Sequence, residues 1–360
     1  MLLFLVAVPH LVLSTCPTNG VVDWLNWGYD AFHSNENPCE TKITTTSASL
    51  GLLWSKSVSG SVLAQPLVVS QYLSKSRGLF DDAVIVATTH GFVYMFDASN
   101  GKQIWKKSLG SLNDCNDMPG GIWGVTGTPL VDRGGGFIYV VNLANVHCLN
   151  LKYGTPCSKW GTSASLGDPS QTQSMANNLY ATYGGLTLLG NTLYATMASH
   201  CDQNTYYGHV TAINTANGLL VGTPWYAVPL NARISGGKPY YGGGVWGTGP
   251  GLLLRPDLKT AFVATGNGIV SGNYGTDENE FLANHVVQLS FITGGALSTS
   301  SNFSSSNTLD NQNDNDFGAT PTVFMPQGCS KTLVVATQKL GQLWVLDSST
   351  MAEIQARHAE

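Results

Sequence analysis

Charged side chains are scarce in this sequence. Asp, Glu, Lys and Arg make up only 11% of the 360 residues, where a typical globular domain has about a quarter. The net charge is −5 and no basic run occurs, so the composition argues against nucleic acid as a partner. Hydrophobic residues contribute 43%, enough to build a core, and the surface must consist largely of Ser, Thr, Asn and Gly. This balance is typical of a secreted β protein with many turns.

The chain also lacks an apolar run long enough to span a membrane as a helix. The apolar run at its start, residues 1–15 (MLLFLVAVPHLVLST), is too short for a spanning helix. We interpret it as a signal peptide. We therefore expect no membrane span, and a mature protein that is secreted to the extracellular space or the periplasm.

None of the seven cysteines stands in a CxxC pair, which argues against a zinc site of the common type. In an exported protein some of the cysteines would form disulfides. Cys148 and Cys157 flank a predicted strand and turn and are the easiest local pair. The sequence leaves the rest of the connectivity open.

A helical period is missing from nearly the whole chain, and a β pattern recurs in its place. Each of five copies has a short segment with Gly or Pro, a β-branched strand, a turn, and a second strand that ends in a polar turn residue. Each copy offers about four short strands, which is one blade of a β-propeller, and blades must stack to bury both of their faces. We therefore predict one all-β propeller domain over residues 22–360. The equivalent turn positions, 53 to 76 residues apart, are Asp97, Asn150, Asn214, Ser290 and Asp347.

Segments outside these copies carry expectations of their own. The aromatic stretch at residues 23–38 is expected to add strands of a sixth blade. Residues 298–315 are so polar that we expect a solvated loop, and residues 349–358 are expected to be helical. Two insertions, at residues 201–207 and 269–284, are expected to form loops on the functional rim.

Residue types that suit a cofactor site gather in the fourth and fifth copies. The run GGGVWG at residues 242–247 combines glycines, which let a backbone approach a flat group, with Trp246, whose ring offers a stacking face. Asn267 follows a predicted strand and can present an amide oxygen to a hard cation. Asp314 and Asp316 add carboxylates at the start of another strand. An alternative stays open at this point: a glycine loop, a core tryptophan and a turn-forming asparagine.

The blade pattern of residues 66–105 resembles the repeat of the pyrroloquinoline quinone (PQQ) dehydrogenases. GGGVWG, then ATGN at residues 264–267, then DNDFGATP at residues 314–321 resemble the polyvinyl alcohol dehydrogenase branch of that quinoprotein family. The resemblance covers roughly residues 24–347. Since propellers of this family have about eight blades, it implies a PQQ-type propeller that is incomplete or truncated, with about six of eight blades.

The resemblance also implies a role for individual residues. Trp246, with Gly244 beside it, would stack on the quinone, and Lys339 of the QKLG segment would touch the quinone from the next blade. Asn267 would ligate calcium together with Asp316, which would also be the general base that takes the alcohol proton. The substrate would be an alcohol or polyol, and the electron acceptor is unknown.

The chain departs from the family pattern at three points. Many members carry vicinal cysteines where this chain has Cys115 alone, and an arginine where it has IWG at residues 122–124. A glutamate that ligates calcium is missing before residue 209, and Asp202 is the candidate metal ligand in its place. Two functions therefore stay open. One is a secreted PQQ- and calcium-dependent dehydrogenase that oxidises alcohol groups, and the other is a non-catalytic propeller that acts as a protein- or glycan-binding scaffold.

Overall fold

The computed structural model describes residues 22–30, 32–40, 51–74, 80–113, 115–160, 164–165, 180–201, 205–232, 234–235, 237–270, 273–274, 281–305, 314–326 and 330–358. Within these ranges the regular elements are β-strands and three short 3-10 helices, and the strands form seven antiparallel sheets. The predicted all-β fold is confirmed. No helix in this part of the chain is long and apolar enough to cross a membrane. The interpreted signal peptide, residues 1–15, lies outside the described residues.

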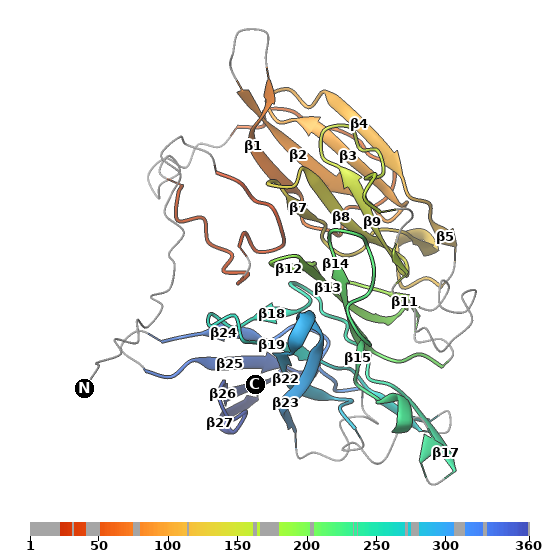
Figure 1. Cartoon of the computed structure of the whole chain (residues 1–360), viewed down its shortest axis with the longest axis vertical. Helices are drawn as coiled ribbons and strands as arrows, with labels where there is room; N and C mark the ends of the chain where they lie inside the picture. Colours follow the sequence, from red (N-terminus) through yellow and green to blue (C-terminus); the bar gives the residue numbers. More distant parts are fainter. Residues whose placement is uncertain are drawn as a thin grey trace.

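Five of the seven sheets are propeller blades, and they follow one another along the chain. The first blade consists of β1 (Leu67–Ser74), β2 (Phe80–Ala87), β3 (Phe92–Asp97) and β4 (Gln103–Ser108), and the second of β7 (Leu130–Asp132), β8 (Phe137–Asn142), β9 (Asn145–Asn150) and β10 (Ala164–Ser165). The third consists of β12 (Thr187–Leu189), β13 (Thr192–Ser199), β14 (His209–Asn214) and β15 (Trp225–Tyr226), and β11 (Tyr180–Ala181) also pairs with β13. The fourth consists of β18 (Leu253–Leu254), β19 (Thr260–Ala264), β22 (His285–Phe291) and β23 (Leu297–Ser304), and the fifth of β24 (Thr322–Phe324), β25 (Leu333–Thr337), β26 (Gln342–Asp347) and β27 (Glu353–His358). In Figure 1 the blades form an arc from β1–β4 at the top to β24–β27 at the lower left, with the red N-terminal segment inside the arc.

Two smaller sheets lie outside the blades. One consists of β5 (Leu112–Asn113) and β6 (Ile122–Trp123), in the connection between the first two blades. The other consists of β16 (Ile234–Ser235), β17 (Lys238–Gly242), β20 (Gly268–Val270) and β21 (Asn273–Tyr274). The second predicted insertion, residues 269–284, is therefore not a loop throughout: its described residues include β21 and most of β20, which pair with each other and, through β20, with β17.

The second blade illustrates why an inner strand is apolar on both sides. Successive side chains of a strand point to opposite faces. Ile138 and Val140 of β8 pack in the core cluster of the first blade, whereas Tyr139 and Val141 pack in the cluster shared with the third. Each of these side chains is at most 4% exposed. Burial between two neighbouring blades therefore explains the near-continuous hydrophobic runs that the repeat pattern contains.

Three tryptophans make the same contact with the blade that follows them: the indole N–H donates to a backbone carbonyl, and the ring packs against a glycine of that blade. Trp105 donates from Nε1 to the Leu151 carbonyl at 3.1 Å, and a Cβ added at Gly154 would lie 2.6 Å from its ring. Trp160 makes the matching contact with the third blade, through the Thr215 carbonyl at 3.0 Å. Trp54 makes it with the first blade, through the Ala98 carbonyl at 2.7 Å. The segment around Trp54 therefore occupies the place that the outer strand of a preceding blade takes elsewhere.

The predicted equivalence of the five turn residues is confirmed by strand register. Each one pairs with the residue near the start of the preceding inner strand, as Asn150 does with Phe137 and Ser290 does with Thr260. Four of the five cap the following turn, because a side-chain oxygen accepts the backbone N–H two residues later. These four are Asp97, Asn150, Asn214 and Asp347. Ser290 lacks the longer side chain of Asp or Asn that makes this bond at the other four positions, and a 3-10 helix, Thr293–Gly295, follows it.

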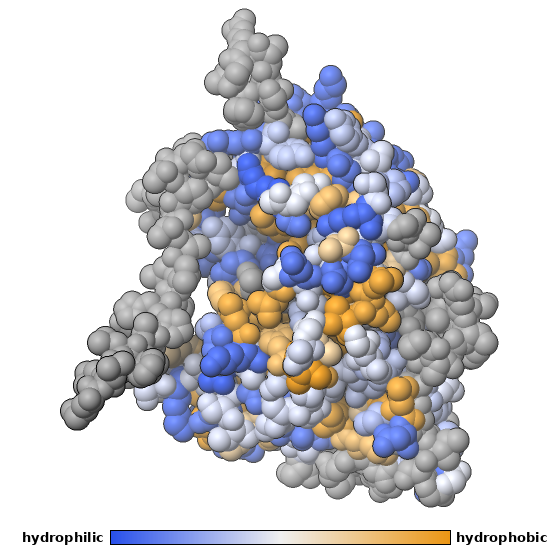
Figure 2. Space-filling model, viewed as in Figure 1, coloured by the Kyte–Doolittle hydropathy of each residue, from blue (hydrophilic) through white to orange (hydrophobic). Residues whose placement is uncertain are grey.

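Two local expectations were wrong. The tail is a strand, β27, rather than a helix, because β26 offers it an unpaired edge. Leu297–Ser304 of the polar tract is likewise a strand, β23, paired with β22. Both are outermost strands of a blade, so their side chains border solvent and a polar sequence does not prevent strand formation. Figure 2 shows hydrophilic residues over much of the visible face and hydrophobic residues gathered near its middle.

Candidate functional site

Glycine-containing segments that precede the first strands of the blades run side by side on the inner side of the arc. Gly184 forms a parallel bridge with Gly249, and Thr248 forms one with Ala319. A Cβ at Gly184 would lie 2.5 Å from the carbonyl oxygen of Gly247. Only glycine allows such an approach, and these contacts hold the segments of the third, fourth and fifth blades together.

Four polar side chains converge where these segments meet. The backbone N–H of Asn267 donates to Asp316 Oδ2 at 3.0 Å, and the Asn267 amide Nδ2 donates to Asp314 Oδ1 at 2.7 Å. Lys339 Nζ lies 2.7 Å from Asp314 Oδ1 and 2.8 Å from Asp316 Oδ1. Asn267 comes from the fourth blade and Lys339 from the turn of the fifth, so the cluster spans a blade boundary.

Asp316 is the buried member of this cluster. Its side chain is 2% exposed, whereas that of Asp314 is 67% exposed. Burial raises the pKa of Asp316; the contact with Lys339 and the N–H of Asn267 oppose this shift, and the charge of Asp314 adds to it. The resulting carboxylate is a stronger base than an ordinary aspartate.

Lys339 supplies the only positive charge that contacts the two carboxylates among the described residues. Burial on its own would lower the pKa of Lys339, but its contacts with Asp314 and Asp316 outweigh burial and the pKa is raised. The ammonium therefore stays charged, and the two carboxylates and one ammonium together carry a net charge of −1. A cation is the kind of ligand that this charge attracts.

One buried oxygen in the cluster has no partner. Asn267 Oδ1 is inaccessible to solvent and accepts no hydrogen bond from the described residues. A buried amide oxygen without a partner carries a free-energy cost, and it is a suitable ligand for Ca²⁺. Asn267 Oδ1 and the Asp316 carboxylate are therefore oxygen ligands of the type that a hard cation takes, and the cation would need further oxygen ligands to complete its shell.

Trp246 lies at the same place, with its indole nitrogen toward the cluster. A Cβ added at Gly266 would lie 2.5 Å from Trp246 Nε1 and 2.7 Å from Asp316 Oδ2, so this glycine separates the two side chains. Gly244 packs against the Trp246 ring, since its Cβ would lie 3.1 Å from Nε1. The ring is half-buried, and Tyr183 packs beside it with centroids 5.5 Å apart.

Of the six residues to which the resemblance assigns a role, the structure brings five together: Trp246, Gly244, Asn267, Asp316 and Lys339. The sixth, Asp202, lies outside the described residues, and the roles of all six stay predictions. Asp314, which the sequence also marked, joins the same cluster. Sequence reasoning missed Tyr183, which carries no motif and reaches Trp246 only through the packing of two blades. It also missed a disulfide between Cys115 and Cys201, for which a separation of 86 residues gave no local signal. The local Cys148–Cys157 disulfide is as predicted.

Comparison with known proteins shows what the fold is. A family model described as outer membrane protein assembly factor BamB matches residues 43–221. A search of curated proteins found no match. The match lies in the blade repeats, and the chain is accordingly a β-propeller built from PQQ-type repeats.

Solved structures agree with this fold. The quinohemoprotein alcohol dehydrogenase ADHIIG from Pseudomonas putida HK5 is similar with a TM-score of 0.67 and 15% identity, over 94% of this chain and 48% of that chain. The quinohemoprotein alcohol dehydrogenase from Comamonas testosteroni gives 0.65 and 15%, over 94% and 49%. A europium-containing methanol dehydrogenase gives 0.64 and 15%, over 93% and 58%.

These likenesses concern the fold alone, because the identity is low. The chain spans about half the length of the two quinohemoprotein alcohol dehydrogenases. The expected partial PQQ-type propeller is confirmed, with five blades in the described part of the chain. The sixth blade expected from residues 23–38 is wrong, because the described residues of that stretch contribute one isolated bridge, Trp24 with Val68, and no strand.

Proposed function

We propose that this chain is a secreted quinoprotein of the dehydrogenase type, which holds PQQ and calcium beside Trp246 and oxidises alcohol groups. The observation that carries the proposal is the buried Asp316 carboxylate, which accepts the backbone N–H of Asn267, a residue whose own amide oxygen Oδ1 is buried without a partner among the described residues. Two disulfides in the described part of the chain favour an oxidising compartment outside the cytoplasm.

Each residue of the cluster has a defined contribution in this proposal. Asn267 Oδ1 and Asp316 would ligate calcium, Lys339 would contact the quinone, and Trp246, seated on Gly244, would stack on it. When bound, PQQ supplies the acceptor of two electrons and calcium acts as a Lewis acid on it. The carboxylate of Asp316 accepts the hydroxyl proton of the alcohol, and its raised pKa suits this role because a general base works best when its pKa approaches the working pH.

The surroundings of Asp316 prepare it for this step. The N–H of Asn267 holds Oδ2 at 3.0 Å and so fixes the carboxylate plane. Tyr183 packs against the half-buried Trp246 with ring centroids 5.5 Å apart and so supports the ring on which the quinone would stack. Lys339 stabilises the ionised carboxylate between turnovers.

A second function, a non-catalytic scaffold, is favoured by a different observation. Lys339 already contacts both carboxylates, so half of the negative charge in the cluster is compensated without a metal. The chain also lacks the arginine, the glutamate and the second cysteine that the family pattern contains. A propeller of this kind would bind a protein or glycan through its loops.

Dye-coupled alcohol oxidation separates the two functions. Purified protein is loaded with PQQ and Ca²⁺ and tested with a set of primary alcohols and polyols and an artificial electron acceptor. Asp316→Asn should reduce the rate by about 100-fold or more, the usual worth of a general base, and should leave stacking on Trp246 intact. Asp314→Asn is the matched control, because Asp314 touches the same Asn267 and Lys339 but is exposed.

The proposal predicts that Asp314→Asn keeps most of the activity. Equal losses in the two variants would show that charge in the cluster matters and that Asp316 is not the base. An absence of dye reduction in the wild type, together with an absence of PQQ binding, would favour the scaffold.

A further inference from the structure

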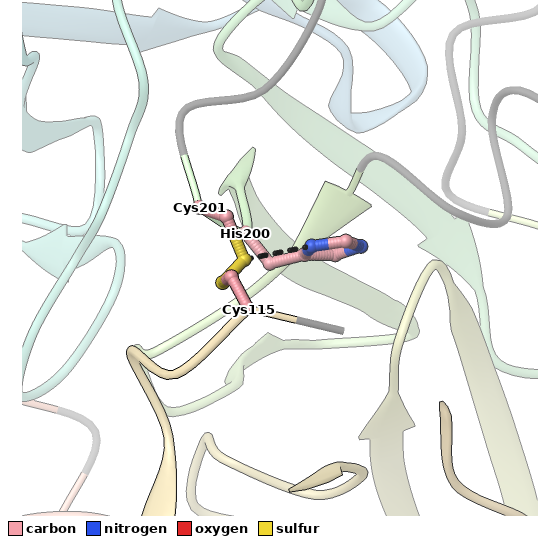
Figure 3. Close-up of side chains that lie close together, drawn as sticks. All are labelled: Cys115, His200 and Cys201. Atoms are coloured by element: carbon pink, nitrogen blue, oxygen red, sulfur yellow. Dashed lines mark hydrogen bonds between the residues drawn. A yellow bond between two sulfur atoms is a disulfide. The ribbon is translucent and has the colours of Figure 1, made fainter. Parts of the chain in front are cut away.

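A disulfide and a histidine meet beside the candidate site. Cys115 follows β5 and Cys201 follows β13, and the bond between them joins two loops that are 86 residues apart in sequence. His200 is 1% exposed, and its Nδ1 lies 3.5 Å from Cys201 Sγ. Figure 3 shows the His200 ring and the two cysteines converging on one point. Trp123 packs on the His200 ring with centroids 5.0 Å apart and so fixes its orientation.

This group has the composition of a metal site. Within the described residues, it is the one set of three His, Cys, Asp or Glu side chains whose ligand atoms all lie within 4.8 Å of one another. Thiolate and imidazole are the ligands that zinc and cuprous ions prefer. Met118, whose thioether is another soft ligand, belongs to the same small buried cluster as Cys115 and Cys201.

We propose that Cys115, Cys201 and His200 form a binding site for a thiophilic metal ion, Zn²⁺ or Cu⁺, once the disulfide is reduced. A dithiol reductant supplies two electrons and two protons. The S–S bond breaks, two thiols form, and the reductant closes into its own disulfide. The metal ion then displaces the two thiol protons to solvent and is bound by two thiolates and His200 Nδ1, which leaves a fourth position for water or another ligand.

The geometry needs little change to accept the ion. In a tetrahedral site with Zn–S bonds of about 2.3 Å and a Zn–N bond of about 2.0 Å, neighbouring ligand atoms lie about 3.5–3.8 Å apart. The distance of 3.5 Å between His200 Nδ1 and Cys201 Sγ already has this value. The sulfurs must separate once their bond is broken, and rotation about the two Cα–Cβ bonds achieves this while the Cα atoms stay 6.0 Å apart.

The second disulfide of the described chain is a natural contrast. Cys148 and Cys157 are 5% and 4% exposed and lie inside the apolar core cluster between the second and third blades. No His, Asp or Glu of the described residues joins them to complete a group of three. Reduction of this pair should therefore create no comparable site, and the pair can be removed from the experiment without affecting the proposal.

The test uses the full chain with the double substitution C148S/C157S as the reference protein. It is reduced with dithiothreitol, and the reductant is removed under anaerobic conditions. The protein is then titrated with Co²⁺, because the thiolate charge-transfer and d–d absorption bands of Co²⁺ report tetrahedral sulfur ligation. Zn²⁺ is added last as a competitor. We expect the reduced reference to bind one more Co²⁺ than the oxidised reference, and Zn²⁺ to displace it. Adding C115S/C201S should abolish this difference. Cys39 is also disulfide-bonded and is reduced by the same treatment, so the decisive comparison is between the reduced reference and reduced C115S/C201S, in which the remaining cysteines are identical.

His200 variants test the third ligand independently of the disulfide. His200→Gln should weaken Co²⁺ binding by at least about 10–100-fold, the loss in metal affinity that removal of even an outer-shell partner of a ligand causes, and His200→Cys, which restores a soft ligand, should recover it. Circular dichroism confirms that each variant keeps the β-sheet signal. The proposal is overturned if reduction adds no metal equivalent, if C115S/C201S binds as the reference does, or if His200→Gln leaves the affinity unchanged. None of these outcomes depends on dehydrogenase activity.

Discussion

Replacing Gly266 by alanine tests the arrangement of the candidate site with a single methyl group. The added Cβ would lie 2.5 Å from Trp246 Nε1 and 2.7 Å from Asp316 Oδ2, well inside contact distance, so the ring or the carboxylate must move. Overpacking of this kind costs about 1–3 kcal/mol of unfolding free energy. For a chain of 360 residues this corresponds to a fall in Tm of about 1–4 °C.

Gly318→Ala is the matched control in the same site. Its Cβ would meet nothing closer than Lys339 Cε at 3.9 Å, which is an ordinary contact. We expect Gly266→Ala to lose most of its PQQ-dependent quenching of tryptophan fluorescence and Gly318→Ala to keep it. In thermal unfolding, the Tm of Gly266→Ala should lie about 1–4 °C below that of Gly318→Ala. If both variants bind PQQ and melt as the wild type does, Trp246 and Asp316 are not packed around Gly266, and the description of the site is wrong.

Three further predictions concern charge and blade packing. Because burial raises the pKa of Asp316 and Lys339 opposes this shift, the acidic limb of the rate profile should lie above the ordinary carboxyl value of 3.8, and Lys339→Met should move it higher. Because the pKa of Asp316 is raised in the folded state, its contribution to the unfolding free energy is complete below pH 3.8 and is lost as the pH rises through the folded pKa. In urea unfolding, the unfolding free energy of Asp316→Asn should therefore rise relative to that of the wild type across that window, and the difference should stay constant at higher pH. Trp160→Ala, which removes a side chain 5% exposed between two blades, should lower the urea-unfolding free energy by about 3–5 kcal/mol.

The blades were predictable because their sequence signals are local. Asp97, Asn150, Asn214 and Asp347 cap turns with side-chain oxygens, and such a turn occurs once in four of the five blades. The alternation of buried and half-buried residues in the strands, as in β25, follows from their two faces. The outer strands β23 and β27 were missed because their pairing depends on the edge that a neighbouring strand offers, which no short window of sequence contains.

The candidate site was predictable in its residue types and much less so in its contacts. The GGGVWG, ATGN and DNDFGATP segments marked Trp246, Asn267 and Asp316, and their adjacency follows from the stacking of blades. That Lys339 bridges Asp314 and Asp316 could not be read from the sequence, because it depends on the position of the turn after β25 relative to the fourth blade. The Cys115–Cys201 disulfide depends in the same way on two loops that meet only in the folded propeller.

Equilibrium titration of the purified chain with PQQ, in the presence and absence of Ca²⁺, tests the central claim most directly. PQQ carries carboxylates and the Asp314–Asp316–Lys339 cluster carries a net charge of −1, so binding beside Trp246 requires a cation to reverse the local charge. We predict saturable quenching of tryptophan fluorescence with one PQQ per chain, dependent on Ca²⁺, lost in Trp246→Ala and retained in Asp314→Asn. Binding that is absent, or that is indifferent to Ca²⁺ and unchanged in Trp246→Ala, would contradict the assignment of this cluster as a quinone and calcium site.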